Sequence, residues 1–357
     1  MSTPAQTLFG RKYRLSIYAQ TSQNGPVEKI VVSDSDWEPF TLKFSFDIEK
    51  VAVYQTFWNS SIKIYNCDGP IPKGPSKGTL LSNLIIKEGM TVEVEAGYYN
   101  GPFGLIWSGQ IFQPIWTREN VVDFVLELRC IQGRLYGTNN FINQTGSPYQ
   151  TAKNEAQFIA EKSVVPIPYT PEAIDTFDDS SLTKDPYPST HFGNPSDVIN
   201  GLASESSLLF WIGQNGMGTT DLTKKLGPVA ASYAPQFSPG STPQTPAPGV
   251  SQTLIGTPRQ TILGADWTVL LDPRMDVVVP LLQAQVDLAA LELTPITISS
   301  NGAFPPRPLQ TKGIYIVAGV THTGDTRGSD WLTHITGIES VRSVLALLGD
   351  GADITGS

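Results

Sequence analysis

The sequence predicts a mainly β protein with a small α+β insertion, and three observations lead to this fold class. Short runs alternate apolar and polar residues, so each run offers one apolar face, as a half-buried strand does. Glycine and proline, 32 and 28 of 357 residues, stand between these runs and are typical of turns between strands. Helix-forming segments are confined to the middle of the chain.

Residues 11–140 are predicted to form the first β domain, an antiparallel barrel or sandwich. Two short strands are expected at 105–107 and 110–112, followed by a charged turn at 117–120. Because strand side chains alternate between faces, each alternating run contributes one face to a shared core. The apolar positions of four such runs are Leu42, Phe44, Phe46 and Ile48; Ile62 and Ile64; Met90, Val92, Val94 and Ala96; and Phe124, Leu126, Leu128 and Cys130.

Residues 141–225 are predicted to form the α+β insertion. A helix is expected within residues 150–164, and a second helix is expected to begin at Asn194 as N-cap and Pro195 as first helical residue. A strand at 208–212 leads into an Asn-Gly pair, which favours a tight hairpin turn.

Residues 226–253 read as a linker rich in proline, serine and glycine, and alternation returns in a second β domain at 254–343. Its last two strands, 313–321 and 331–338, flank a turn-rich octet. If these strands form a hairpin, we expect His322 to face Trp331. Residues 1–10 and 344–357 are expected to be terminal tails.

Charge and composition exclude several classes of protein. The net charge of −9 argues against a nucleic-acid-binding protein, which usually carries a basic patch. Apolar stretches are too short and too interrupted for a membrane span, so no membrane insertion is expected. Cys67 and Cys130 are expected to be buried free thiols, which fits synthesis in a reducing compartment.

Several segments, taken in order, resemble a known family. Residues 313–331, from Gly-Ile-Tyr-Ile-Val through His-Thr-Gly-Asp-Thr-Arg-Gly to Trp, resemble the C-terminal signature of the central baseplate hub of contractile-tailed phages. Residues 87–98 and 105–111 resemble the first tube-like domain of that family, and residues 194–203 resemble its helical insertion. The matches are spread over about residues 85–340.

The resemblance implies two tail-tube-like antiparallel β-barrel domains in each chain. Such hubs resemble homotrimers that form a pseudo-sixfold ring, which joins the hexameric tail tube to the trimeric central spike and lets DNA pass. The partners implied are further copies of the chain, the tail tube protein and the central spike protein, with the tape measure protein and baseplate wedge proteins as additional candidates. The location implied is the tail baseplate of the virion, assembled in the host cytoplasm.

Two other functions remain open at this point. The chain is also similar to the trunk of the type VI secretion spike, so a hub of another contractile injection system is the first alternative. A tail-associated cell-wall hydrolase is the second, although no residue cluster supports it. We expect no enzymatic activity and no cofactor, because neither cysteine has a histidine nearby in sequence and no cluster of residues indicates a catalytic site.

The turn before the last strand supplies candidate site residues. His322 and Asp325 belong to residue types that bind metals, but a hairpin turn or interface is the favoured interpretation, because the two histidines of this hairpin are not expected to converge. Glycines provide backbone freedom, carboxylates cap turn amides, and Arg327 is expected to pair with a carboxylate. The candidates are His322, Gly324, Asp325, Arg327, Gly328 and Trp331.

An acidic, aromatic loop in the first domain supplies the other candidates. Large aromatic side chains often carry binding energy at interfaces. Packing in the core or at its rim is the more common role of such aromatics. The segment before the strand at 41–48 is the candidate contact with a partner, through Asp34, Asp36, Trp37 and Phe40. An acidic loop at 172–185 lacks the spacing of a calcium-binding loop and is expected to be solvated.

Overall fold

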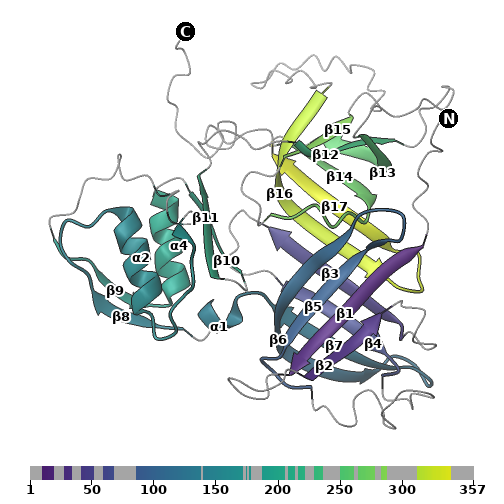
Figure 1. Cartoon of the computed structure of the whole chain (residues 1–357), viewed down its shortest axis with the longest axis horizontal. Coiled ribbons are helices and arrows are strands. Elements are labelled where there is room, and N and C mark those ends of the chain that lie inside the picture. The colour runs from purple at the N-terminus through teal and green to yellow at the C-terminus, as the bar shows by residue number, and fades with distance from the viewer. Residues whose placement is uncertain are drawn as a thin grey trace, which may run out of the picture.

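The computed structural model describes residues 10–19, 28–33, 42–51, 59–67, 86–137, 140–171, 174, 177, 187–205, 208–213, 216–221, 229–235, 250–260, 264–277, 283–287 and 312–338. These residues form a mainly β protein with a small helical insertion, as predicted (Figure 1). None of the helices in this part of the chain is long and apolar enough to cross a membrane.

The first β region contains seven strands that are joined by antiparallel pairings. Their order in the sheet is β3-β4-β7-β6-β5-β1-β2. The bounds are β1 Arg11–Ala19, β2 Glu28–Ser33, β3 Phe44–Val51, β4 Asn59–Tyr65, β5 Thr91–Tyr98, β6 Phe103–Arg118 and β7 Phe124–Ile131. The two strands predicted at 105–107 and 110–112 are one long strand, β6, which absorbs a bulge between Ile111 and Gln113 instead of turning.

The second β region contains six strands that close into a ring. Their order is β15-β12-β13-β14-β17-β16, and β15 also pairs with β16. The bounds are β12 Val229–Pro235, β13 Val250–Gln260, β14 Gly264–Leu270, β15 Gln283–Asp287, β16 Lys312–Asp325 and β17 Trp331–Ile338. β12 runs parallel to both its neighbours, which differs from the all-antiparallel expectation. Both β12 and the start of β13 lie inside the predicted linker, so part of that segment is sheet, not spacer.

The two β regions repeat one strand order. Read from β3, the first region runs β3-β4-β7-β6-β5-β1; read from β13, the second runs β13-β14-β17-β16-β15-β12. The strands correspond in chain order, so β6 and β7 match β16 and β17, whereas β2 has no counterpart among the described strands. The long strand of each hairpin even carries its bulge at the same place, between Ile111 and Gln113 in β6 and between Val317 and Gly319 in β16.

The two regions are joined edge to edge. β16 pairs antiparallel with β3, from Gly319 opposite Val51 to Asp325 opposite Ser45, and we call this pairing the seam. It makes one continuous 13-stranded sheet and one hydrophobic core that contains residues of both regions (Figure 1). The predicted core positions of the first region are buried except Phe124, which is 43% exposed, and Leu42, which is half-buried.

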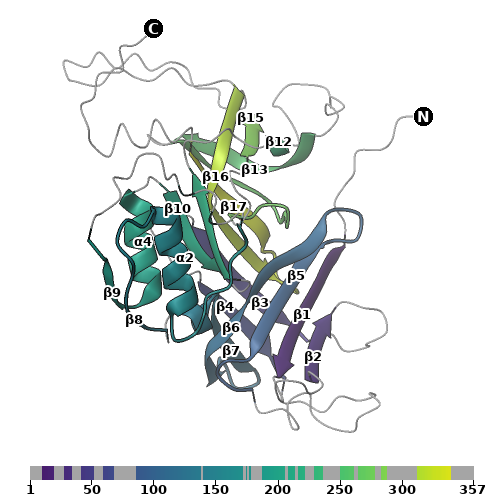
Figure 2. The same cartoon turned by 60° about the vertical axis from the view of Figure 1, so that its left-hand side comes forward.

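The insertion has a core of its own and lies beside the sheet (Figures 1 and 2). It contains α2 Ala152–Lys162, α4 Pro195–Glu205 and two hairpins, β8 Ile142–Thr145 with β9 Thr190–Gly193 and β10 Leu208–Gly213 with β11 Gly216–Asp221. A short helix, α1 Arg134–Gly137, precedes it. Both predicted helices and the predicted hairpin are confirmed. The side chain of Asn194 accepts a hydrogen bond from the Ser196 amide, as the predicted N-cap requires.

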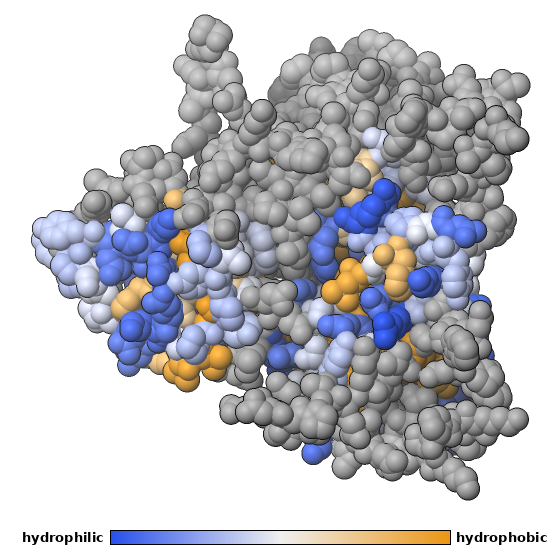
Figure 3. Space-filling view, in the orientation of Figure 1, coloured by the Kyte–Doolittle hydropathy of each residue, from blue (hydrophilic) through white to orange (hydrophobic). Residues whose placement is uncertain are grey.

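Cys67 and Cys130 are buried and form no disulfide, as predicted. Burial raises the pKa of the Cys130 thiol to about 12, so it stays protonated and unreactive at neutral pH. On the surface of the insertion, over β8 and β9, apolar side chains are visible (Figure 3), and Phe141 and Phe192 are exposed there in an edge-to-face pair.

Candidate functional site: the β16–β17 hairpin at the seam

The predicted candidates of the C-terminal signature lie together on the β16–β17 hairpin, where the second β region meets the first. We call it the covered hairpin, because β3 and the start of β1 lie against it. Its register differs from the prediction by two residues: Gly324, not His322, lies opposite Trp331, and His322 lies opposite Thr333. The length of the turn sets this register, and the bulge between Val317 and Gly319 shifts the pairs on its far side by one residue. Neither feature was evident from alternation alone.

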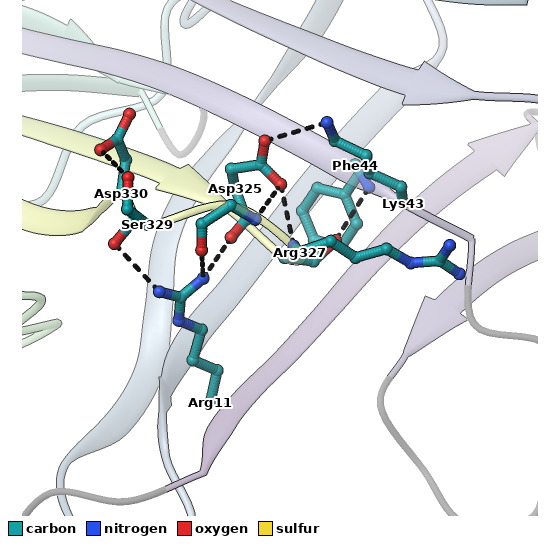
Figure 4. A network of polar contacts seen from close by, with 9 residues as sticks. Arg11, Lys43, Phe44, Asp325, Arg327, Ser329 and Asp330 are labelled. Carbon is teal, nitrogen blue, oxygen red and sulfur yellow. Dashed lines mark hydrogen bonds and ion pairs between the residues drawn. The ribbon is translucent and has the colours of Figure 1, made fainter. Parts of the chain in front are cut away.

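The carboxylate of Asp325 organises the turn. One oxygen accepts hydrogen bonds from the amides of Arg327 and Gly328, both at 2.8 Å, which confirms the predicted capping role. The other lies 3.1 Å from the Lys43 ammonium group (Figure 4). Partial burial raises the pKa of Asp325, but these amides and Lys43 outweigh it and lower the pKa below its usual value. The guanidinium group of Arg327 extends away from Asp325, so Lys43 holds the place expected for it.

Arg11, at the start of β1, binds the backbone of the same turn. Its guanidinium group donates to the carbonyl oxygens of Asp325 at 2.5 Å, Gly328 at 2.6 Å and Ser329 at 3.0 Å (Figure 4). Asp330 accepts from the Ser329 hydroxyl group rather than from a turn amide. A planar donor suits several carbonyl groups at once. Residues more than 310 positions apart in sequence are thereby joined.

Trp331 anchors the covered hairpin in the core of the first region. It is 2% exposed, and its indole N–H donates to the Gly97 carbonyl oxygen at 3.2 Å. Its ring packs edge-on against Phe46 at 5.4 Å and Tyr13 at 6.3 Å, and the Arg11 guanidinium carbon lies 5.4 Å from the ring centroid. Such aromatic contacts stabilise beyond the area they bury.

The two candidate glycines are required by close approach. A Cβ atom on Gly324 would lie 2.2 Å from the Phe46 ring, and one on Gly328 would lie 2.8 Å from the Asp325 carboxyl carbon. Gly324 therefore lets the outer end of the Phe46 ring lie close to the β16 backbone. Its role is packing across the seam, not the backbone freedom that the sequence suggested.

His322 is fully buried behind the seam. Its Nδ1 lies 2.9 Å from the Thr333 hydroxyl oxygen, which also accepts a hydrogen bond from the Asp272 amide at 2.9 Å. Burial lowers the pKa of His322 to about 4, and the charge of nearby Lys50 acts in the same direction. A neutral imidazole in this place is a structural hydrogen-bonding group. No group of three metal-ligating side chains occurs in the described part of the chain.

The β6–β7 hairpin of the first region is the counterpart of the covered hairpin, and we call it the open hairpin. Its Trp116 corresponds to His322 and its Phe124 to Trp331, because each stands at the same place after the bulge and turn. Trp116 is 52% exposed and Phe124 is 43% exposed. The side chains at these equivalent places are thus buried in the covered hairpin and about half exposed in the open hairpin.

The candidates of the first domain lie outside the described residues: Asp34, Asp36, Trp37 and Phe40. Of the acidic loop at 172–185, the structure describes only residues 174 and 177. Sequence reasoning missed Arg11 and Lys43. Their only signal is a basic residue at the start of a strand, which is too common to single them out.

One polar cluster of the insertion bears comparison with a catalytic site. Ser189 lies 3.3 Å and Glu155 3.0 Å from the same nitrogen, Nε2, of His191. A nucleophile, base and acid relay uses both ring nitrogens, so this arrangement is not of that kind. The hydrogen bond from His191 lowers the pKa of Glu155, and the cluster lines a cavity of about 410 Å³ between α2 and α4.

Comparison with solved structures finds tail proteins of similar fold, among them the following two. No protein-family model and no curated protein matches the chain. The 43 kDa tail protein of prophage MuSo2 from Shewanella oneidensis is 8% identical, with 92% of this chain and 98% of that chain covered and a TM-score of 0.50. A tail protein from Neisseria meningitidis MC58 is 10% identical, with 93% and 97% covered and a TM-score of 0.52. The chain shares its fold with these tail proteins.

A further likeness has a TM-score of 0.46 and adds nothing to that assignment. It is to an E. coli protein described as a component of the type VI secretion system, 10% identical, with 85% of this chain and 76% of that chain covered.

Proposed function

We propose that the chain is the structural hub of a phage tail baseplate, in which three copies form a pseudo-sixfold ring between the tail tube and the central spike. The observation that carries the proposal is the repeated strand order in one chain. Three chains with two equivalent units each supply six units around one axis, while the whole assembly keeps threefold symmetry.

The way in which the two units meet supports a ring. β16 corresponds to β6, and its partner β3 corresponds to β13, so the seam joins two different edges of equivalent units. Such a head-to-tail contact can be repeated from unit to unit until it closes. A contact between identical edges would stop at a pair.

The fold supports the tail as the place of action, because both tail proteins named above match over nearly their whole length. In this proposal the ring stacks on the tail tube protein on one side and holds the central spike protein on the other, with tape measure and wedge proteins nearby. DNA passes through the ring. The role is mechanical, and it involves no cofactor and no catalysis.

Light scattering on the purified chain tests the assembly. A ring of three copies has a mass of about 116 kDa, three times the 38.7 kDa of one chain. A particle that stays monomeric at every concentration, with tube and spike proteins present as well as absent, contradicts the proposal. Activity on peptidoglycan that is abolished by one acid-to-alanine change would instead favour a cell-wall hydrolase.

A further inference from the structure

The open hairpin has a backbone edge that none of the described strands covers, and we call such an edge a free edge. β5 pairs with β6 from Gly97 opposite Phe103 to Thr91 opposite Gln110, and backbone hydrogen bonds with Gly89 and Met90 extend this by one residue, to Ile111. Beyond that point, residues 112–118 pair with β7 on one side and with none of the described strands on the other. A row of unpaired amide and carbonyl groups of this kind is a template for another strand.

The corresponding edge of the covered hairpin is occupied. β15 pairs with β16 as far as Gln283 opposite Ile316, which matches the end of the β5–β6 pairing at Gln110. After the bulge, residues 319–325 of β16 pair with β3 in the seam. What β3 does for β16, no described strand does for β6.

A matching edge, which is also uncovered by the strands that the structure describes, exists on β13, the counterpart of β3. The last pairing between β12 and β13 is Pro235 opposite Leu254. From Ile255 to Gln260, β13 pairs with β14 on one side, and no described strand covers its other side. Ile255 is 40% exposed, and Arg259 is exposed as well.

The exposure of the aromatic side chains also indicates that this edge of the open hairpin contacts a partner. At the covered hairpin, Trp331 packs against Phe46 and Tyr13 of the first region, and His322 is fully buried. At the open hairpin, Phe124 and Trp116 stand in the equivalent places and are half exposed. Aromatic side chains in such places are typical of an interface that is filled on assembly.

We propose that the end of β6 in one copy, from Trp116 to Arg118, pairs antiparallel with the segment Ile255–Gln260 of β13 in a second copy, so that the seam is repeated between chains. Carried over from the seam, the register places Thr117 opposite Arg259 and Trp116 opposite Gln260 of the second copy. The two free edges are different surfaces, so the contact is head-to-tail; that it closes at three copies rests on the function proposed above.

Two interruptions limit the backbone pairing between β6 and β13, and they determine which residue pairs are best suited to a test. Pro114 lacks an amide N–H and so removes one donor from β6, and β13 has a two-residue bulge with Pro258 between Ile255 and Arg259. The pairs at Thr117 and Trp116 lie outside both interruptions. They are the best-defined points of the interface.

Cysteine cross-linking tests the register. Mixing a Thr117→Cys chain with an Arg259→Cys chain should give a covalent dimer on mild oxidation, and neither chain alone should give one. A chain with both changes should give a ladder of two, three and closed species. The matched control replaces Arg259→Cys by Asn200→Cys, an exposed position on α4, and should give no product above background. The native cysteines are buried and can stay.

A second variant tests the interface without oxidation. Trp116→Glu should raise the concentration at which half of the chains are assembled at least tenfold and leave the unfolding temperature of the dissociated chain unchanged. Tyr187→Glu, which changes a more exposed aromatic residue on the insertion, should leave assembly as it is.

The outcomes separate this inference from the hub function. A 116 kDa particle with no specific cross-link and no effect of Trp116→Glu overturns the edge pairing and leaves the hub standing. A specific cross-link in a particle of another mass supports the edge pairing and contradicts the trimer. A monomer without a cross-link contradicts both.

Discussion

The covered hairpin and the open hairpin have the same strand order, the same bulge and opposite surroundings. In the covered hairpin the position after the turn is a buried tryptophan and the backbone opposite it is glycine; in the open hairpin the same positions are Phe124 and Arg118, both reachable by solvent. Strand pairing therefore determines the shape of each hairpin. The strands packed against the hairpin determine which side chains it can carry. Four experiments test this comparison, from the largest expected effect to the smallest.

Truncation of the aromatic residue after each turn should separate the hairpins most clearly. Trp331→Ala removes a fully packed ring at the seam and should lower the free energy of unfolding by about 3–5 kcal/mol. Phe124→Ala in the dissociated chain should cost about 1 kcal/mol or less, because half of that ring is already in water. Denaturant unfolding followed by circular dichroism measures both. Equal losses would show that the two hairpins are not in different environments.

Acidification should weaken the chain through His322. The folded state holds its pKa at about 4, below the usual 6.5, so the unfolded chain binds more protons between these values. Stability should therefore fall as pH drops from 6.5 to 4, by up to about 3 kcal/mol at 1.36 kcal/mol per pKa unit. Denaturant midpoints at several pH values should show this slope in the native chain and a shallower one in His322→Gln. Equal pH dependence in the native chain and in His322→Gln would show that protonation of His322 does not cause the loss of stability.

Adding one methyl group at the seam should be costly, and removing a long side chain from the open hairpin should not. Gly324→Ala places a Cβ atom against the Phe46 ring and should cost about 1–3 kcal/mol. Arg118→Ala, at the corresponding place in β6, should change stability by about 0.5 kcal/mol or less. Thermal unfolding of the two variants and of the native chain measures both changes in stability. A neutral Gly324→Ala would mean that the seam is loosely packed.

The Lys43–Asp325 ion pair should contribute least, because both side chains are partly exposed. Lys43→Met should cost about 0.5 kcal/mol, and Lys63→Met, at an exposed position on β4, should cost nothing measurable. The lowered pKa of Asp325 means that this contribution is present at neutral pH and is lost as the pH falls through that pKa. Raising the salt concentration to 1 M should shrink the difference between the two variants. A difference that is unaffected by salt would point to packing of the lysine stem.

Much of the fold and part of the candidate site followed from sequence patterns. Alternation identified the strands around Phe44 and Val92, and the Asn194-Pro195 pair identified the start of α4, because these signals depend on neighbours in sequence. The C-terminal hairpin was singled out by its motif, and its Asp325 caps the turn as expected. The prediction that Phe124 is buried was wrong for the single chain, because alternation reports the face of a residue but not whether anything covers that face.

By itself the sequence determined the local elements: where strands run and turn, where two helices begin, and which glycines and carboxylates form the last turn. Only the tertiary structure decided that β16 pairs with β3, that Arg11 reaches the turn more than 310 residues away, and that the two regions repeat one strand order with one edge filled and another open. The reason is physical. Apart from proline, every residue offers the same amide and carbonyl groups at a strand edge. The partner of that edge is therefore determined mainly by the shape of the assembled sheet and not by the residues along the strand.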